Sequence, residues 1–257
     1  MARLFDDGSS EYLEIDTAAI TDVPMTISLW FRTNDVTLNQ YGVTLADKDV
    51  EDQRFGIGAG GDIANDPLFF YARNGVDSIV IPTTNFMTVN TWHHGLVVGE
   101  ISGTDASYKV ILDGDTGNAG DSGSEVARPV GFDRTSIGRM GDSTPSDYFS
   151  GDLGEVAIWN INMSYAEVVE LATGAVAWKV RPQNLVFYAS LIRGLNDIKG
   201  GLVLTAFSGN SGPIVSPHPR IIEEGSTRGV WAIPAVEGVA PTGVLYGPLV
   251  GPLGGPI

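Results

Sequence analysis

The chain has 257 residues, with 31 acidic and 15 basic side chains, and its formal net charge is −16. Binding to nucleic acid needs basic stripes that neutralise phosphates, so this balance excludes nucleic acid as the expected partner, and an anionic membrane surface would repel the chain. The sequence has no cysteine, which excludes disulfides, thiolate metal sites and a cysteine nucleophile.

Short apolar segments recur along the chain between Gly, Asn, Asp and Pro residues, which is the pattern of strands that end in turns. In the segment at 26–33, Ile27, Leu29 and Phe31 occupy alternate positions and therefore share one face of a strand. The predicted strands are 12–15, 26–33, 41–47, 54–58, 68–73, 78–82, 91–99, 108–114, 135–139, 152–160, 184–190 and 201–207.

Residues 164–174 break this pattern and predict a short helix. Ser164 is suited to the N-cap, Glu167 completes a capping box, and Gly174 suits the position after the C-cap. Val168 and Leu171 share one face of this helix. A dozen strands and one helix predict an all-β fold, a two-sheet antiparallel β-sandwich of the jelly-roll kind, over residues 1–207.

The composition changes after Phe207, because residues 208–257 hold eight of the 14 prolines. Proline lacks a backbone donor, so a central strand is not expected there. The segment is nevertheless apolar, which predicts an arm that packs on its own domain, docks on a neighbouring subunit, or stays disordered. The residues expected to anchor or oligomerise the protein are Ile221, Ile222, Trp231, Leu245, Tyr246, Leu249 and Leu253.

Paired carboxylates are the first catalytic pattern to consider, because glycoside hydrolysis uses two of them. Glu14 and Asp16 occupy alternate positions, but Ala19 stands where a further acid would be needed. Asp152 and Glu155 are expected on opposite faces of a regular strand. The sequence also has no G-x-S-x-G elbow and no phosphate-binding P-loop, so it predicts a protein that is not an enzyme.

Calcium is the most plausible ion, since the predicted loops are rich in acids and Ca²⁺ takes oxygen ligands. No EF-hand spacing occurs, so a site would be assembled from separate loops. The candidate ligands are Asp113, Asp142 and Asp152, and no other cofactor is expected. His93 and His94 are neighbours on a strand and point to opposite faces, which argues against a shared zinc ion.

A sugar site would need aromatic side chains on an exposed face or loop. The candidates are Tyr41, Tyr71 and Tyr148. The start of the chain lacks the apolar centre of a secretory signal, and no run of about 18 apolar residues occurs. We therefore expect synthesis in the cytoplasm and no membrane insertion.

Five segments in this order resemble the laminin-G-like, concanavalin A-like lectin domain: "TISLWFRT", "TWHHGLVV", "YKVILDGD", "IGR" and "FSGDLGEVAIWNINMSYAEVVELATG". The resemblance covers residues 5–207. It implies a β-sandwich that is often a non-catalytic module and binds carbohydrate or protein, sometimes through calcium. The family's usual Asp before Glu155 is Gly154 here.

The opening segment, "MARLFDDGSSEYLEI", resembles domains of phage and prophage virion proteins. This resemblance implies a non-enzymatic virion component, a capsid decoration or a tail or fibre protein. Such a protein would display the sandwich and dock through residues 208–257 onto other virion proteins or copies of itself. The alternative is a carbohydrate-binding lectin module for a cell-surface glycan, with or without calcium. A glycoside hydrolase is the weakest reading.

Overall fold

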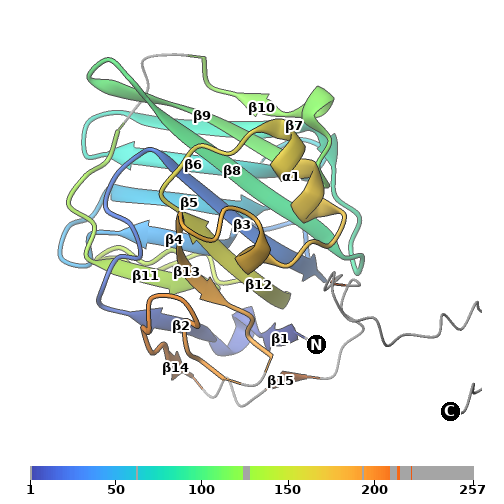
Figure 1. Ribbon diagram of the computed structural model, residues 1–257. Helices are drawn as coiled ribbons and strands as arrows, with labels where there is room; N and C mark the ends of the chain where they lie inside the picture. Colours follow the sequence, from blue (N-terminus) through green and yellow to red (C-terminus); the bar gives the residue numbers. More distant parts are fainter. Residues whose placement is uncertain are drawn as a thin grey trace, which may run out of the picture. The chain divides into compact units, whose positions relative to one another are not determined.

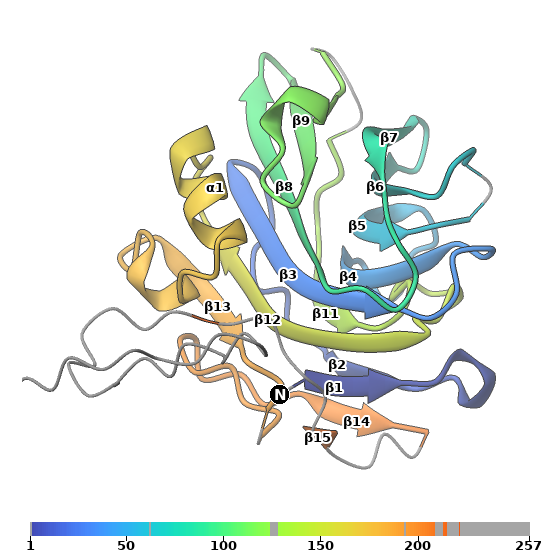
Figure 2. The same ribbon diagram turned by 90° about the vertical axis from the view of Figure 1, so that its right-hand side faces the viewer.

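The computed structural model describes residues 2–61, 63–123, 128–192, 194–208, 213–214 and 221. Two antiparallel β-sheets pack face to face in this part of the chain, which confirms the predicted β-sandwich (Figures 1 and 2). By its internal contacts the chain divides into Met1–Glu223 and Glu224–Ile257, and the second unit lies outside the described residues. Among the described residues, no helix has the length and apolar character needed to cross a membrane.

The first sheet, here called the helix-side sheet, has eight strands within the described residues. The strand order is β10-β9-β8-β3-β12-β1-β15, with β13 also paired to β12. The strands are β1 (Ala2–Phe5), β3 (Met25–Thr33), β8 (His93–Ser102), β9 (Asp105–Leu112), β10 (Gly120–Asp121), β12 (Gly151–Trp159), β13 (Leu185–Ala189) and β15 (Pro213–Ile214).

The second sheet, here called the loop-side sheet, has seven strands in the described part of the chain, in the order β14-β2-β11-β4-β5-β6-β7. The strands are β2 (Tyr12–Ile15), β4 (Gln40–Ala46), β5 (Gln53–Ala59), β6 (Pro67–Asn74), β7 (Ser78–Phe86), β11 (Arg134–Ile137) and β14 (Thr205–Phe207). Three 3-10 helices among the described residues join these elements: η1 (Asp7–Ser9), η2 (Thr116–Asn118) and η3 (Ala177–Lys179).

The core lies between the sheets and follows the alternation predicted for β3. Ile27, Leu29 and Phe31 are buried in one cluster with apolar residues of the loop-side sheet such as Val43 and Phe55. The intervening positions of β3 face the other side of the helix-side sheet. Because side chains alternate along a strand, burial of one set fixes the register of the whole strand.

Helix α1 (Tyr165–Ala172) covers the outer face of the helix-side sheet, on the side away from β4 to β7 (Figure 2). The carboxylate of Glu167 accepts a hydrogen bond from the backbone N–H of Ser164 at 2.9 Å, which confirms the predicted capping box. Val168 and Leu171 pack against Trp159 of β12 in a second buried cluster. The helix therefore covers part of this face, and a cavity of about 290 Å³ remains between the start of α1 and strands β8 and β9.

Strand β12 departs from the regular strand that the sequence predicts. Its pairing with β3 shifts register between Gly154 and Ala157, and Glu155 has a φ of 53°. This bulge lets the carboxylate of Glu155 accept a hydrogen bond from the hydroxyl of Tyr188, a member of the α1-covered cluster. Asp152 also lies on the outer side, where it binds Arg32. The prediction that the two acids lie on opposite faces is therefore wrong.

Three short strands were not predicted from the sequence: β1, β10 and β15. Strand β15 pairs with β1 at the end of the helix-side sheet, so strand pairing continues beyond Phe207. Pro213 lies on this edge strand, where a residue without a backbone N–H removes no hydrogen bond from the interior of the sheet. Conversely, only Thr205–Phe207 of the predicted strand 201–207 is a strand.

Candidate functional site

Residues 138–149, here called the 138–149 segment, cross the outer face of the loop-side sheet. The hydroxyl of Thr44 on β4 donates to the carbonyl of Arg139 at 3.0 Å, and Arg134 on β11 donates to the carbonyl of Gly141 at 3.3 Å. A Cβ at Gly141 would lie 2.3 Å from the Ser136 hydroxyl, so only glycine allows this close approach. Met140 packs on the same face. The segment therefore covers the sheet around β11 and β4.

Buried ion pairs hold the 138–149 segment against the sheet. Arg139 donates to the carboxylate of Glu14 on β2, and Asp142 accepts from Arg54 on β5. Asp142 is 0% exposed and Glu14 is 8% exposed. Buried charges of this kind need their partners, because a lone charge would have lost its water without compensation. The segment is thus a fixed part of the fold.

A cavity of about 340 Å³ lies where the segment approaches the start of β4, and we call it the rim cavity. Its lining residues come from η1, from the link before β4 and from the 138–149 segment: Asp7, Leu38, Asn39, Asp147 and Tyr148. The ring of Tyr148 lies 6.1 Å from that of Tyr12, and Tyr12 stacks on Phe207 at 4.6 Å. Tyr148, which lines the cavity, therefore belongs to a group of three aromatic rings with Tyr12 and Phe207.

The rim cavity carries two carboxylates. Asp147 has a φ of 52°, its backbone carbonyl accepts from the N–H of Tyr41 at 3.1 Å, and its side chain accepts from the Ser146 hydroxyl at 2.9 Å. Burial raises the pKa of Tyr41, and the negative charge of Asp147 raises it further. Within the described part of the chain, neither Asp7 nor Asp147 forms an ion pair. The cavity thus combines an aromatic ring with two carboxylates that have no cationic partner among the described residues.

A family model matches residues 7–169, more than half of the chain, and its description is the concanavalin A-like lectin/glucanases superfamily. This chain belongs to that superfamily. No curated protein matches the sequence. The superfamily assignment agrees with the resemblance seen in the sequence and with the two-sheet fold.

This concanavalin A-like domain is similar to several solved structures. A candidate carbohydrate-binding protein from Bacteroides ovatus is 16% identical with a TM-score of 0.54, and the match covers 80% of this chain and 57% of that one. The LG4-5 domains of the mouse laminin α1 chain are 15% identical with a TM-score of 0.46, over 61% of this chain and 40% of that one. The CBM40 of the Ruminococcus gnavus IT-sialidase, solved with α2,3-sialyllactose, is 12% identical with a TM-score of 0.47, over 67% and 97%.

The three tyrosines predicted for sugar binding have different surroundings in the concanavalin A-like domain. Tyr41 is 4% exposed and meets Phe69 edge-on at 5.4 Å, so its ring is not an exposed platform. Tyr71 is half-buried on β6, and the guanidinium of Arg54 lies 5.2 Å from its ring centre. Tyr148 alone of the three lines the rim cavity.

The three predicted calcium ligands do not come together as a group in this domain. Asp113 accepts from Nδ1 of His93 and from the backbone N–H of His94, both at 2.7 Å. Asp142 binds Arg54 below the 138–149 segment, and Asp152 binds Arg32 at 2.8 Å on the helix-side sheet. Calcium binding by the protein stays a prediction.

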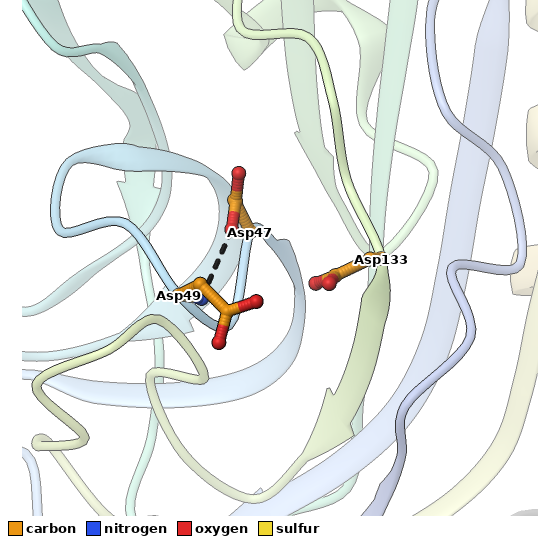
Figure 3. A group of neighbouring side chains, drawn as sticks. All are labelled: Asp47, Asp49 and Asp133. Atoms are coloured by element: carbon orange, nitrogen blue, oxygen red, sulfur yellow. Dashed lines mark hydrogen bonds between the residues drawn. The ribbon is translucent and has the colours of Figure 1, made fainter.

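A different acidic group, not predicted from the sequence, joins the loop between β4 and β5 to the start of β11. The carboxylates of Asp47, Asp49 and Asp133 all lie within 4.8 Å of one another (Figure 3). Lys48 offsets part of the negative charge of this group, because its ammonium lies 2.6 Å from Asp133 and 2.9 Å from Asp49. The hydrogen bond to Asp133, followed by that to Asp49, raises the pKa of Lys48. Strand pairing of Ala46 with Arg134 creates the group, and no local sequence signal reveals it.

Replacing Lys48 by Met is expected to make the domain sensitive to calcium. The three carboxylates would repel one another without the ammonium, and a divalent cation would relieve the repulsion. Melting temperatures measured in EDTA and in calcium should differ more for Lys48→Met than for the wild type. Lys199→Met, which removes the same charge away from this group, is the control. A variant that responds to calcium no more than the wild type would contradict this role of Lys48.

Most of the predicted docking residues cannot be placed on the fold. Ile221 is half-buried. The other six, Ile222, Trp231, Leu245, Tyr246, Leu249 and Leu253, lie outside the described residues. Docking through this arm, onto virion proteins or copies of the chain, stays a prediction.

Proposed function

We propose that this concanavalin A-like domain is a non-catalytic carbohydrate-binding module, and that it holds sugar in the rim cavity. The observation that carries the proposal is the lining of that cavity. Sugars present an apolar face to aromatic rings and hydroxyl groups to planar acceptors, and Tyr148 offers the ring while Asp7 and Asp147 offer the polar groups. Sugar-binding neighbours with the same fold give additional support to the choice of ligand.

The position of the cavity follows from what covers the two sheets. Helix α1 covers part of the outer face of the helix-side sheet, and the 138–149 segment covers the outer face of the loop-side sheet around β11 and β4. A ligand on the loop-side sheet is therefore received at its rim, beside Tyr148. At about 340 Å³ the cavity is at the small end of ligand sites, which run from about 300 to 1,000 Å³. This size favours one sugar residue or a chain end over a long polymer.

Binding without catalysis is supported by the acids that the sequence marked as possible catalysts. Glu14 is engaged by Arg139 and Ser136, and Asp16 by Arg134 at 2.9 Å. Asp152 binds Arg32, and Glu155 accepts from Tyr188. Each of these carboxylates thus serves an interaction inside the fold. Glycosidase carboxylates must instead face the sugar from both sides of the scissile bond.

Replacing Tyr148 by Ala is expected to weaken glycan binding at least about tenfold, a loss of about 1.4 kcal/mol, because the ring supplies the apolar contact. Binding of the full chain to a glycan array identifies a ligand, and calorimetry measures its affinity for both proteins. Tyr165→Ala removes an exposed tyrosine from α1 on the other sheet and should leave the affinity unchanged.

Two results would contradict the proposal. One is a wild-type protein that binds no glycan on the array, either with calcium or with EDTA. The other is a Tyr148→Ala protein that melts like the wild type and binds with the same affinity. Release of reducing sugar from the bound glycan would instead show a hydrolase. The virion role and virion localisation predicted from the sequence stay predictions.

A further inference from the structure

The rim cavity differs from a neutral sugar site in the charge of its lining. Its two charged side chains are Asp7 and Asp147, and the remaining lining residues are Leu38, Asn39 and Tyr148. Both acids are half-buried, which reduces the screening of their charge by water. Among the described residues no cationic side chain pairs with Asp7 or Asp147, so the cavity presents negative charge to a ligand.

The nearby arginines are committed to other carboxylates. Arg139 lies over the ring of Tyr12 at 3.6 Å but binds Glu14. Arg54 binds Asp142 and lies 3.5 Å from Asp52. Arg134 binds Asp16 at 2.9 Å. Each of these arginines is therefore paired with a carboxylate that does not line the cavity.

We propose that the rim cavity selects sugars with a free, protonated amino group over their neutral counterparts, and that it rejects acidic sugars. This inference rests on the proposed function and names its ligand class. An ammonium group has three donors, and the carboxylates of Asp7 and Asp147 are acceptors that match them. The ring of Tyr148 adds attraction for a cation near its face. A uronic or sialic acid would place its carboxylate against two others.

A bound calcium ion is the competing explanation for two acids in one cavity. Calcium takes six to eight oxygen ligands, commonly several of them carboxylates. Within the described residues, the group of three close acids is Asp47, Asp49 and Asp133, and it does not include Asp7 or Asp147. Tyr148 and Leu38, which also line the cavity, add a phenol and an aliphatic side chain. This set suits an organic ammonium group better than a calcium ion.

Four oligosaccharides that differ only in their terminal residue test the inference: one each ending in glucosamine, N-acetylglucosamine, glucose and glucuronic acid. Calorimetry at pH 6 and low salt, with the full chain in EDTA, is expected to give glucosamine at least about tenfold the affinity of glucose. N-acetylglucosamine should resemble glucose, and glucuronic acid should not bind. Added salt should reduce the preference, because salt screens charge.

Asp7→Asn and Asp147→Asn should each reduce the preference for the amine while glucose binding persists. Asp77→Asn removes the same charge from an exposed turn between β6 and β7 and should leave the preference intact. Equal affinity for glucosamine and glucose, or tight binding of glucuronic acid, would overturn the inference and leave the proposed function standing. Binding that EDTA abolishes would also overturn it in favour of a metal. If none of the four binds and the glycan array is also blank, the proposed function itself fails.

Discussion

Replacing Arg54 by Met is expected to lower the free energy of unfolding by about 3–5 kcal/mol, the usual cost of removing one partner from a buried ion pair. Asp142 is 0% exposed and accepts a hydrogen bond from Arg54. Its remaining donors are the backbone N–H groups of Thr144 at 3.0 Å and of Asp52 at 3.5 Å. Two amides do not replace a guanidinium, so the variant would leave an uncompensated carboxylate beneath the 138–149 segment.

Urea unfolding of the wild type and of Arg54→Met at neutral pH measures this loss. Arg73→Met is the matched control, because Arg73 bonds Asp52 at 2.7 Å on the same sheet with a side chain that is 35% exposed. Partly exposed pairs contribute about 0–1 kcal/mol, so the control should lose far less.

The double variant Arg54→Met, Asp142→Asn distinguishes two causes of the lost stability, an unpaired carboxylate and the lost packing of the arginine side chain. Removing the carboxylate as well should recover a large part of the stability lost in Arg54→Met. A double variant that is no more stable than Arg54→Met would show that the arginine acts through its packing on Tyr71 instead. A single variant as stable as Arg73→Met would contradict the buried pair altogether.

The elements that the sequence predicted well are those determined by local patterns. The alternation of Ile27, Leu29 and Phe31 places one face of β3 in the core, and the capping signals at Ser164 and Glu167 locate the start of α1. Both signals lie within a few residues of one another. Local periodicity and caps are sufficient for such elements, because the buried face of one segment decides its conformation.

The rim cavity could not be predicted in the same way, because its residues come from three separate stretches of the chain. Asp7, Asn39 and Tyr148 meet only after β2, β4 and β11 have paired. Tyr41 and Tyr148 were equivalent candidates in the sequence. The pairing of β4 with β5 shifts register between Tyr41 and Val43, and Tyr41 then packs on Phe69. Exposure of a tyrosine therefore depended on a bulge and on a covering loop, neither of which has a reliable local signal.

The acids whose positions were predicted wrongly also show that local sequence patterns do not determine contacts between distant segments. A regular strand would separate Asp152 from Glu155, but the left-handed φ of Glu155 inserts an extra residue against β3. Asp113, Asp142 and Asp152 were grouped because all lie in predicted loops or strand ends. The fold pairs the first with His93 and the other two with arginines. The number of acids in the sequence therefore indicated the net charge. It did not indicate which carboxylates would remain free to bind a ligand.

A second large effect is expected from acid, through His94. This side chain is 1% exposed on β8, and Nε2 lies 2.8 Å from the hydroxyl of Ser28. Nδ1 has no hydrogen-bond partner among the described residues. Burial lowers the pKa of His94 to about 4, and the charge of Asp113 opposes this shift. The imidazole is therefore held neutral inside the fold.

The sign of the effect follows from proton uptake. The unfolded chain binds a proton at His94 below its ordinary pKa of 6.5, whereas the folded chain does so only near pH 4. Between these values acid favours the unfolded state. The contribution to stability is complete above pH 6.5 and is lost as the pH falls, by about 1.4 kcal/mol per pH unit and about 3 kcal/mol in all.

Carboxylates act in a lower window and can be told apart. Hydrogen bonds from Arg128 are the main cause of the lowered pKa of Asp22, so its contribution is present above its ordinary pKa of 3.8 and is lost only below it. Urea unfolding between pH 4.5 and 6.5 therefore reports chiefly on His94.

The wild type should lose stability steadily as the pH falls through that range. His94→Gln should be less stable at neutral pH but nearly flat over the same range, because the titrating group is gone. Ser28→Ala keeps the imidazole and removes only its hydroxyl partner, so it should keep the slope. A slope that persists in His94→Gln would assign the proton uptake to another group, and a flat wild-type profile would mean that His94 titrates normally in the fold.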